Sequence, residues 1–267
     1  MNMKVYLMMS ADNYSDSNYT VMGDTRALVA DPTAPHRMLH TPSYVVLIDH
    51  PTAGWIMYDT GTADDYLDTY PDHIREAMRT EKPDAYRMER QLALVGVRPE
   101  QIQHVILSHM HMDHIGNNKL FAQTADFYVA KEEAGHAFRM VMNSQQPEDH
   151  GWYIKEEVLQ PLKRLTYIDR DEVLFPGVEV VLLPGHTPGV MGLVLHLDGG
   201  TLIFTSDAAN VQANYEGNAP GGVMDSVGFL ESVRKIHSLQ RQYDAQVFFS
   251  HDTDQVKQLK FAPAYYE

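Results

Sequence analysis

The residues best suited to do chemistry lie in one short segment, His109-Met110-His111-Met112-Asp113-His114. Four of its side chains are potential metal ligands, and the segment follows directly on an apolar run. In a loop that leaves a strand, His109 and His111 converge on one cation, while Asp113 and His114 point to a second position. Four adjacent polar side chains cannot all be buried without partners at an acceptable cost. The segment therefore predicts half of a two-metal site, with a solvated surface cluster as the alternative.

Three later segments have the same form, in which a short apolar run ends on a possible ligand. These ligands are His186, Asp207 and His251. Strands that end at one edge of a sheet bring their terminal residues together, and α/β proteins build their sites there. With the first segment, the candidate set becomes five imidazoles and two carboxylates. Mixed nitrogen and oxygen ligands suit Zn²⁺, which we expect, with Mn²⁺, Fe²⁺ and Co²⁺ as alternatives.

Composition narrows the choice of chemistry and of partners. The chain has 267 residues and no cysteine, which excludes disulfides, zinc–thiolate sites and thiol nucleophiles. A net charge of −15 would repel nucleic acid and anionic membranes, so we expect a small-molecule partner. The start of the chain has no signal-peptide pattern, and no apolar stretch is long enough to span a bilayer. We therefore expect a soluble, cytoplasmic protein.

The elements that must position these residues follow from the hydrophobic pattern. Short β-branched and aromatic runs between polar or Pro/Gly turns indicate strands, and apolar residues at helical spacing indicate helices. We predict strands at 3–9, 44–48, 54–58, 103–107, 125–129, 179–183, 201–204 and 247–250, and helices at 64–79, 86–94 and 226–240. This alternation, without repeats or long linkers, predicts one α/β domain over residues 1–267 in which helices cover sheets. A division into two sheet-containing halves near 165–175 would fit a sandwich.

The order of the candidate ligands resembles the pattern of the metallo-β-lactamase superfamily, over a metal-binding core of about residues 44–252. The resemblance implies an αββα sandwich with the metals at one edge. Two imidazoles of the first segment and His186 would hold one metal, whereas Asp207 would bridge both. The implied ligands are His109, His111 and His186 for one metal and Asp113, His114 and His251 for the other.

Asp59 follows the strand predicted at 54–58 and matches a superfamily Asp that lies beside the metals. Orienting a ligand imidazole is the physical reason to keep a carboxylate there. A plain turn-forming Asp before Gly61 is the alternative.

The implied chemistry is hydrolysis. Two metals bridged by a carboxylate and a water lower the pKa of that water and supply a hydroxide that attacks the substrate. Because one metal polarises the carbonyl and the other takes the leaving oxygen, no Ser or Cys nucleophile is required. The resemblance makes Asp113 the candidate to pass a proton to the leaving group.

Metal sites of this type hydrolyse several classes of substrate, so other features of the sequence are needed to distinguish among these classes. RNA-processing nucleases would need a basic surface, and glyoxalase II continues with a long helical domain where only a short segment follows His251. The chain resembles the N-acyl-homoserine lactonase branch most, together with the related pyridoxolactonases, so we expect opening of an N-acyl-homoserine lactone. The alternatives are another ester, thioester, sulfate-ester or phosphodiester hydrolase of this fold, and a non-catalytic metal-binding sensor.

One position departs from that branch. Those lactonases carry a Tyr three residues after the bridging Asp, where its hydroxyl donates to the substrate carbonyl oxygen. Here the residue is Asn210, whose amide is a weaker but usable donor, and Tyr215 or Asn214 from the same loop are alternatives.

We expect the substrate pocket to be lined by residues 11–38 and 134–153, with 218–222 as a rim or a simple connector. Met and aromatic side chains make an adaptable apolar wall for a small ligand, although plain core packing is the alternative for each one. The candidates are Tyr14, Tyr19, Met22, Phe138, Met140, Met142, Trp152 and Tyr153.

Overall fold

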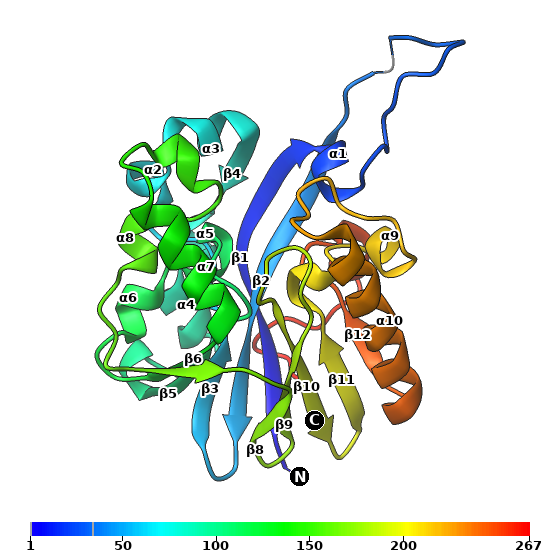
Figure 1. The fold of residues 1–267 in the computed structure, drawn as a ribbon. Helices are drawn as coiled ribbons and strands as arrows, with labels where there is room; N and C mark the ends of the chain where they lie inside the picture. Colours follow the sequence, from blue (N-terminus) through cyan, green and yellow to red (C-terminus); the bar gives the residue numbers. More distant parts are fainter. Residues whose placement is uncertain (1, 34) are drawn as a thin grey trace.

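Two β-sheets lie face to face at the centre of the molecule, with helices on their outer faces (Figure 1). The computed structural model describes residues 2–33 and 35–267. The first sheet has seven strands in the order β4-β1-β2-β3-β5-β6-β7, and the second has five in the order β12-β11-β10-β9-β8. The predicted αββα sandwich is confirmed.

The first sheet combines a long antiparallel hairpin with a parallel half. β1 pairs with β2 from Lys4 opposite Asp49 to Asp16 opposite Met38. Strands β3, β5, β6 and β7 are parallel neighbours, so their carboxyl ends share one edge. The strands are β1 (Lys4–Asp16), β2 (Met38–His50), β3 (Gly54–Tyr58), β4 (Met78–Glu81), β5 (Ile102–Ile106), β6 (Asp126–Ala130) and β7 (Arg164–Ile168).

The second sheet is antiparallel except for the parallel pair β11 and β12. The chain passes from the first sheet to the second between Ile168 and Glu172, within the division predicted near 165–175. The strands are β8 (Glu172–Phe175), β9 (Val178–Leu182), β10 (Met191–Leu197), β11 (Gly200–Phe204) and β12 (Gln246–Phe248).

The core sits mainly between the sheets because side chains alternate along each strand. In β1, Val5 and Leu7 join the inner cluster with Val180 and Leu193 of the second sheet. Their neighbour Tyr6 points the other way and packs under the helices that cover the first sheet. A separate cluster joins the outer face of the second sheet to the helix at 226–243.

The helices flank both sheets and are mostly short. The longest, α10 (Ser226–Tyr243), begins after Asp225, whose side chain accepts a hydrogen bond from Val227 N. The others are α1 (Ser17–Thr20), α2 (Tyr66–Thr69), α3 (Asp72–Ala77), α4 (Met88–Ala93), α5 (Met112–Ile115), α6 (Asn118–Phe121), α7 (Lys131–Met142), α8 (Lys155–Val158), α9 (Gln212–Tyr215) and α11 (Thr253–Val256). Among the described residues, none of these helices is long and apolar enough to cross a membrane.

The single helix predicted at 64–79 is wrong, because the segment forms α2, then α3, then β4. Pro71 separates the two helices, since a proline disfavours helical geometry in the residue before it. Tyr70 accordingly has an extended ψ of 123°. The last two residues of the segment, Met78 and Arg79, pair with Ser15 and Tyr14 of β1, so tertiary pairing overrides the helical spacing there.

Candidate metal centre

Three imidazoles meet at one end of the sandwich. His109 and His111 follow β5, and His186 lies in the loop between β9 and β10. His111 Nδ1 lies 3.1 Å from His109 Nε2 and 3.0 Å from His186 Nε2, and all three side chains are buried. A neutral imidazole has one N–H donor and one nitrogen lone pair. Hydrogen bonds between neutral rings therefore poorly satisfy three nitrogens that face one another. A cation between them would satisfy all three.

A second group lies beside the first. It consists of Asp113 and His114 at the start of α5 and His251 after β12. Asp113 Oδ2 is 3.7 Å from both His114 Nε2 and His251 Nε2. The possible ligand atoms of this group lie within 4.8 Å of one another, as do those of the first group.

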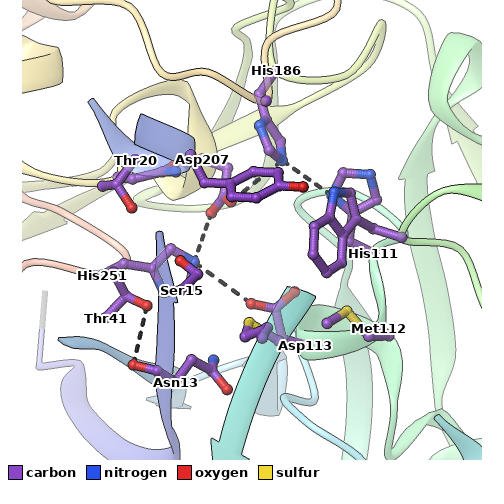
Figure 2. A pocket seen from close by; sticks show the side chains of 15 residues that line it. Asn13, Ser15, Thr20, Thr41, His111, Met112, Asp113, His186, Asp207 and His251 are labelled. Atoms are coloured by element: carbon purple, nitrogen blue, oxygen red, sulfur yellow. Dashed lines mark hydrogen bonds and ion pairs between the residues drawn. The ribbon is translucent and has the colours of Figure 1, made fainter. Parts of the chain in front are cut away.

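Asp207 lies between the two groups, and its two oxygens face different sides (Figure 2). Oδ1 is 3.3 Å from His114 Nε2 and 3.2 Å from His251 Nε2, while Oδ2 is 3.4 Å from His186 Nε2. Asp207 comes from a short 3₁₀ turn, Ser206–Ala208, directly after β11. Candidate ligands that follow strands of both sheets therefore meet around one carboxylate.

The residues fit two divalent cations. His114 Nε2 and Asp207 Oδ1 are buried and have no hydrogen-bond partner within the protein. Leaving buried polar atoms unpaired is costly, and a metal ion would satisfy both. Five imidazoles with two carboxylates and no sulfur is a ligand set typical of zinc and related ions.

Asp59 is tied to the second group. It follows β3 with a positive φ of 61°, and its carboxylate accepts from Ser108 N and Ser108 Oγ at 2.7 Å each. Asp59 Oδ2 also lies 2.8 Å from His114 Nδ1, which leaves Nε2 of that ring facing Asp207. This geometry supports the predicted orienting role. Sequence reasoning missed Ser108, although its place just before the histidine motif was a signal.

Burial and charge act in opposite directions on the cluster. Burial holds the pKa of His109, His111 and His186 below the ordinary value of histidine. Burial also opposes a charge on His114, but nearby carboxylates, first Asp113, outweigh it and raise the pKa of His114 well above the ordinary value. In the same way, burial is outweighed at Asp207, where the surrounding imidazoles hold the carboxyl pKa well below its usual range.

A cavity opens onto the cluster, and two of the predicted wall residues line it (Figure 2). Tyr19 and Trp152 meet edge to face there, with ring centroids 5.8 Å apart. Asn13, Ser15 and Thr41 from β1 and β2 give part of the wall a polar character. The full lining is Asn13, Ser15, Tyr19, Thr20, Thr41, Met78, His111, Met112, Asp113, Trp152, His186, Asp207, Asn210, Gly222 and His251.

Most of the predicted apolar wall lies elsewhere. Tyr14 stacks on His40 with ring centroids 4.8 Å apart, and Met140 packs against the core under the helices. Phe138 and Met142 are exposed. The prediction rested on the type of each side chain, and type alone does not say which face of a helix or strand a side chain occupies.

The two candidate substrate contacts are placed differently. Asn210 lines the cavity, and its buried Oδ1 makes no hydrogen bond within the protein. Tyr215 is not among the lining residues, because its hydroxyl bonds to Gln240 and its ring packs on His237. Asn214 uses its side chain to bind the backbone of its own loop and of Thr20. Of the three, the structure brings only Asn210 to the cavity.

A two-sheet sandwich with His and Asp ligands gathered at one edge defines a class of metal-dependent hydrolase. The family model of the metallo-beta-lactamase superfamily matches residues 39–241, and the chain belongs to that superfamily. The predicted resemblance is confirmed.

Within the superfamily, similar proteins share one name. The chain is 28% identical over 247 residues to an N-acyl homoserine lactonase of Bacillus cereus, covering 90% of this chain and 93% of that protein. It is 30% identical over 185 residues to N-acyl homoserine lactonase AttM of Azorhizobium caulinodans, covering 66% and 68%. A solved N-acyl homoserine lactone hydrolase, with N-hexanoyl-L-homoserine bound at its catalytic metal centre, has the same fold. The TM-score is 0.84 at 24% identity, with 98% of both chains covered.

Proposed function

We propose that this protein is a dinuclear metal-dependent lactonase that opens the ring of N-acyl homoserine lactones. The observation that carries the proposal is the placement of Asp207, whose two oxygens face two separate groups of ligands at the floor of a cavity. The lactonases that resemble the chain over most of its length support the choice of substrate. Quorum quenching, the term used for a solved N-acyl homoserine lactone hydrolase of the same fold, is the proposed role.

We propose Zn²⁺ for both positions, with His109, His111 and His186 holding one ion, Asp113, His114 and His251 the other, and Asp207 bridging them. When bound, two such ions activate a water for attack and polarise the carbonyl of the substrate. Asp59 keeps the His114 ring in place through its Nδ1 atom.

Two side chains beside the cluster serve the substrate itself. Asp113 lines the cavity and is the proposed group that takes the proton lost by the attacking water and passes it to the ring oxygen as the C–O bond of the ester breaks. Asn210 is the proposed hydrogen-bond donor to the carbonyl oxygen as negative charge develops there. An amide whose oxygen has no internal partner can turn over to present its NH₂ group at the same place.

The test measures ring opening by the purified protein as the release of acid. The substrates are N-acyl homoserine lactones of different acyl chain lengths, and aromatic lactones, chromogenic esters and a phosphodiester are compared with them. We expect turnover to be fastest on acyl homoserine lactones, to vanish after exhaustive chelation and to return with Zn²⁺. Activity that survives complete metal removal would contradict the proposal, and so would two bound ions with no hydrolysis of any lactone.

A variant pair tests the role of Asp113. We expect Asp113→Asn to lower kcat by about 10²- to 10⁴-fold, the range typical of a lost general acid. The exposed Asp68→Asn, a change of the same type outside the cavity, should leave kcat unchanged. Metal content measured on both variants separates a lost proton donor from a lost ligand.

The lack of cysteine in the sequence supports a proposal for where the protein acts. We propose the cytoplasm, because a protein with no cysteine gains nothing from an oxidising compartment and the proposed signals are small molecules. Fractionation of cells that express the chain checks this location.

A further inference from the structure

A buried carboxyl group outside the ligand set contacts the loops that carry one metal group. Glu133 lies in the first turn of α7 and is fully buried. Its Oε1 atom accepts a hydrogen bond from Met110 N at 2.9 Å and another from Tyr153 OH at 3.1 Å. Burying a carboxyl group is costly, so a structure that retains one has a use for its hydrogen bonds.

The first bond reaches the histidine motif itself. Met110 stands between His109 and His111, so its N–H belongs to the short backbone stretch that spaces these two imidazoles. Fixing that N–H limits rotation of the backbone on either side. The convergence of His109 Nε2 and His111 Nδ1 at 3.1 Å depends on this spacing.

The second bond reaches the ring of His111. Tyr153 is buried with its ring edge-on to that imidazole, with centroids 4.6 Å apart. The hydroxyl bond to Glu133 holds the phenol ring, and the phenol ring limits the orientations open to His111.

The same residue packs against the loop that follows His186. A Cβ atom at Gly189 would lie only 2.4 Å from Glu133 N, so this loop approaches α7 as closely as a glycine allows. Burial raises the pKa of Glu133, and the hydrogen bonds from Met110 N and Tyr153 OH counter that rise. Glu133 thus touches the segments of His109, His111 and His186.

The other group of ligands is oriented without Glu133. His114 Nδ1 faces Asp59, and His251 Nδ1 lies 3.2 Å from the carbonyl oxygen of Pro42. Asp59 thus contacts His114 directly and reaches His109 only through Ser108 Oγ, which lies 3.1 Å from His109 Nδ1, whereas Glu133 contacts the segments of His109, His111 and His186.

We propose that Glu133 is the positioning residue of the His109–His111–His186 group, so that its loss weakens one metal position and spares the other. The inference rests on the proposed function in one respect, that each group holds one ion. It makes no use of the substrate, and the metal readouts therefore separate a failure of this inference from a failure of the lactonase proposal.

The experiment compares metal retention in Glu133→Ala, Glu133→Gln and Glu132→Ala. Zinc-loaded proteins are dialysed against a graded chelator, and bound zinc is counted. We expect Glu133→Ala to lose one equivalent of zinc at a chelator concentration about 10- to 100-fold lower than the parent protein does, the effect typical of residues that orient metal ligands. The variant should keep the second equivalent of zinc as tightly as the parent protein. Glu133→Gln should retain both equivalents, because its amide oxygen replaces Oε1. Glu132 is exposed on the same helix, and its variant should match the parent.

A spectroscopic readout assigns the weakened position. In cobalt-loaded protein, imidazole resonances shifted by the paramagnetic ion should be lost for His109, His111 and His186 in Glu133→Ala and kept for His114 and His251. Tyr153→Phe keeps the ring and removes only its hydroxyl bond, so it should fold and show a smaller shift of the same kind. Zinc retention and spectra that are unchanged in both Glu133→Ala and Tyr153→Phe would overturn the proposal. Equal loss of metal from the two positions would also overturn it, and so would a failure of Glu133→Gln to retain both ions.

Discussion

Protons and metal ions compete for the same side chains in this cluster. The pKa of His114 is raised because carboxylates, first Asp113, outweigh burial, and the pKa of His251 is raised because Asp207 does the same. A raised pKa means that the metal-free cluster still binds protons at a pH where an ordinary histidine has lost them. A metal ion needs the neutral imidazole and must displace those protons.

Zinc binding to the chelated protein should therefore release protons, and its apparent affinity should keep rising as pH increases past the ordinary histidine pKa of about 6.5. Calorimetric titration in buffers of different ionisation enthalpy counts the protons released. Asp59→Asn removes one of the carboxylates that raise the pKa of His114, so it should release fewer. A heat that is identical in every buffer would contradict this expectation.

Asn210 lines the cavity and is the proposed donor to the substrate carbonyl oxygen. A preorganised donor aimed at developing charge contributes mainly to kcat, because its bond strengthens in the transition state. An amide is neutral and does not ionise in the pH range where the enzyme would act.

We expect Asn210→Ala to lower kcat by on the order of 10²-fold and to change KM much less. The matched control is Asn218→Ala, since Asn218 is exposed, follows α9 just as Asn210 precedes it and is not among the cavity-lining residues. Steady-state kinetics on one lactone distinguish the two. A rise in KM with an unchanged kcat for Asn210→Ala would instead assign the residue to binding of the substrate in its ground state.

The loop that presents His186 is held by the start of α10. Its Gly185 has a φ of 144°, and a Cβ atom there would lie 2.5 Å from the backbone of Phe229. Met224 N and Asp225 N both donate to Gly185 O at 2.9 Å, and Ser232 Oγ donates to Pro184 O at 2.7 Å. A helix on the outer face of the second sheet thereby fixes the loop that carries the candidate ligand His186.

Gly185→Ala should destabilise the fold by about 1 to 3 kcal/mol, because the methyl group overlaps backbone atoms that cannot move independently. Gly135→Ala is the matched control. Gly135 lies in α7 with only a flexible Arg139 side chain near its Cβ position, so the same change should stabilise by about 0.5 to 1 kcal/mol. Denaturant unfolding of both variants measures the difference, and equal effects would refute the packing argument.

Elements of strong pattern were predictable, and elements made by tertiary contact were not. The strand predicted at 54–58 is β3 with the same bounds, because an apolar run between turns has few alternatives. β10 was missed, since Gly192 interrupts its apolar pattern near the start of the strand. The candidate ligands were found because each follows a strand in sequence. Glu133 was missed because it lies on a helix and acts through the backbone of Met110.

Across the whole molecule, the cluster of candidate ligands takes residues from both sheets. Four of the candidate ligands follow β5 of the first sheet, whereas His186, Asp207 and His251 follow strands of the second. Bound metal would therefore link the sheets at one end, in addition to the apolar core between them. Ligands that bind only the folded state stabilise it in proportion to the logarithm of their concentration over Kd.

Chelation should lower the Tm by about 5 to 10 °C, which corresponds to a few kcal/mol for a chain of this size. Re-addition of zinc should restore it. His251→Asn should show a smaller metal-dependent shift, while His36→Asn, with a side chain that is 95% exposed, should behave as the parent does. Calorimetry with and without chelator makes the comparison, and a Tm that does not depend on metal would contradict it.

The connection between Ile168 and Glu172 also divides the ligands, because the chain crosses it once on its way from the first sheet to the second. A cut there would give two fragments, neither of which carries a complete ligand group. The carboxyl-terminal fragment would still be drawn back to β1, where Tyr266 N donates to Val5 O and Ala262 N to Leu7 O at 2.9 and 2.8 Å. Such a split protein would be a zinc-dependent complementation pair, in which recovered lactone opening reports that the two fragments have met.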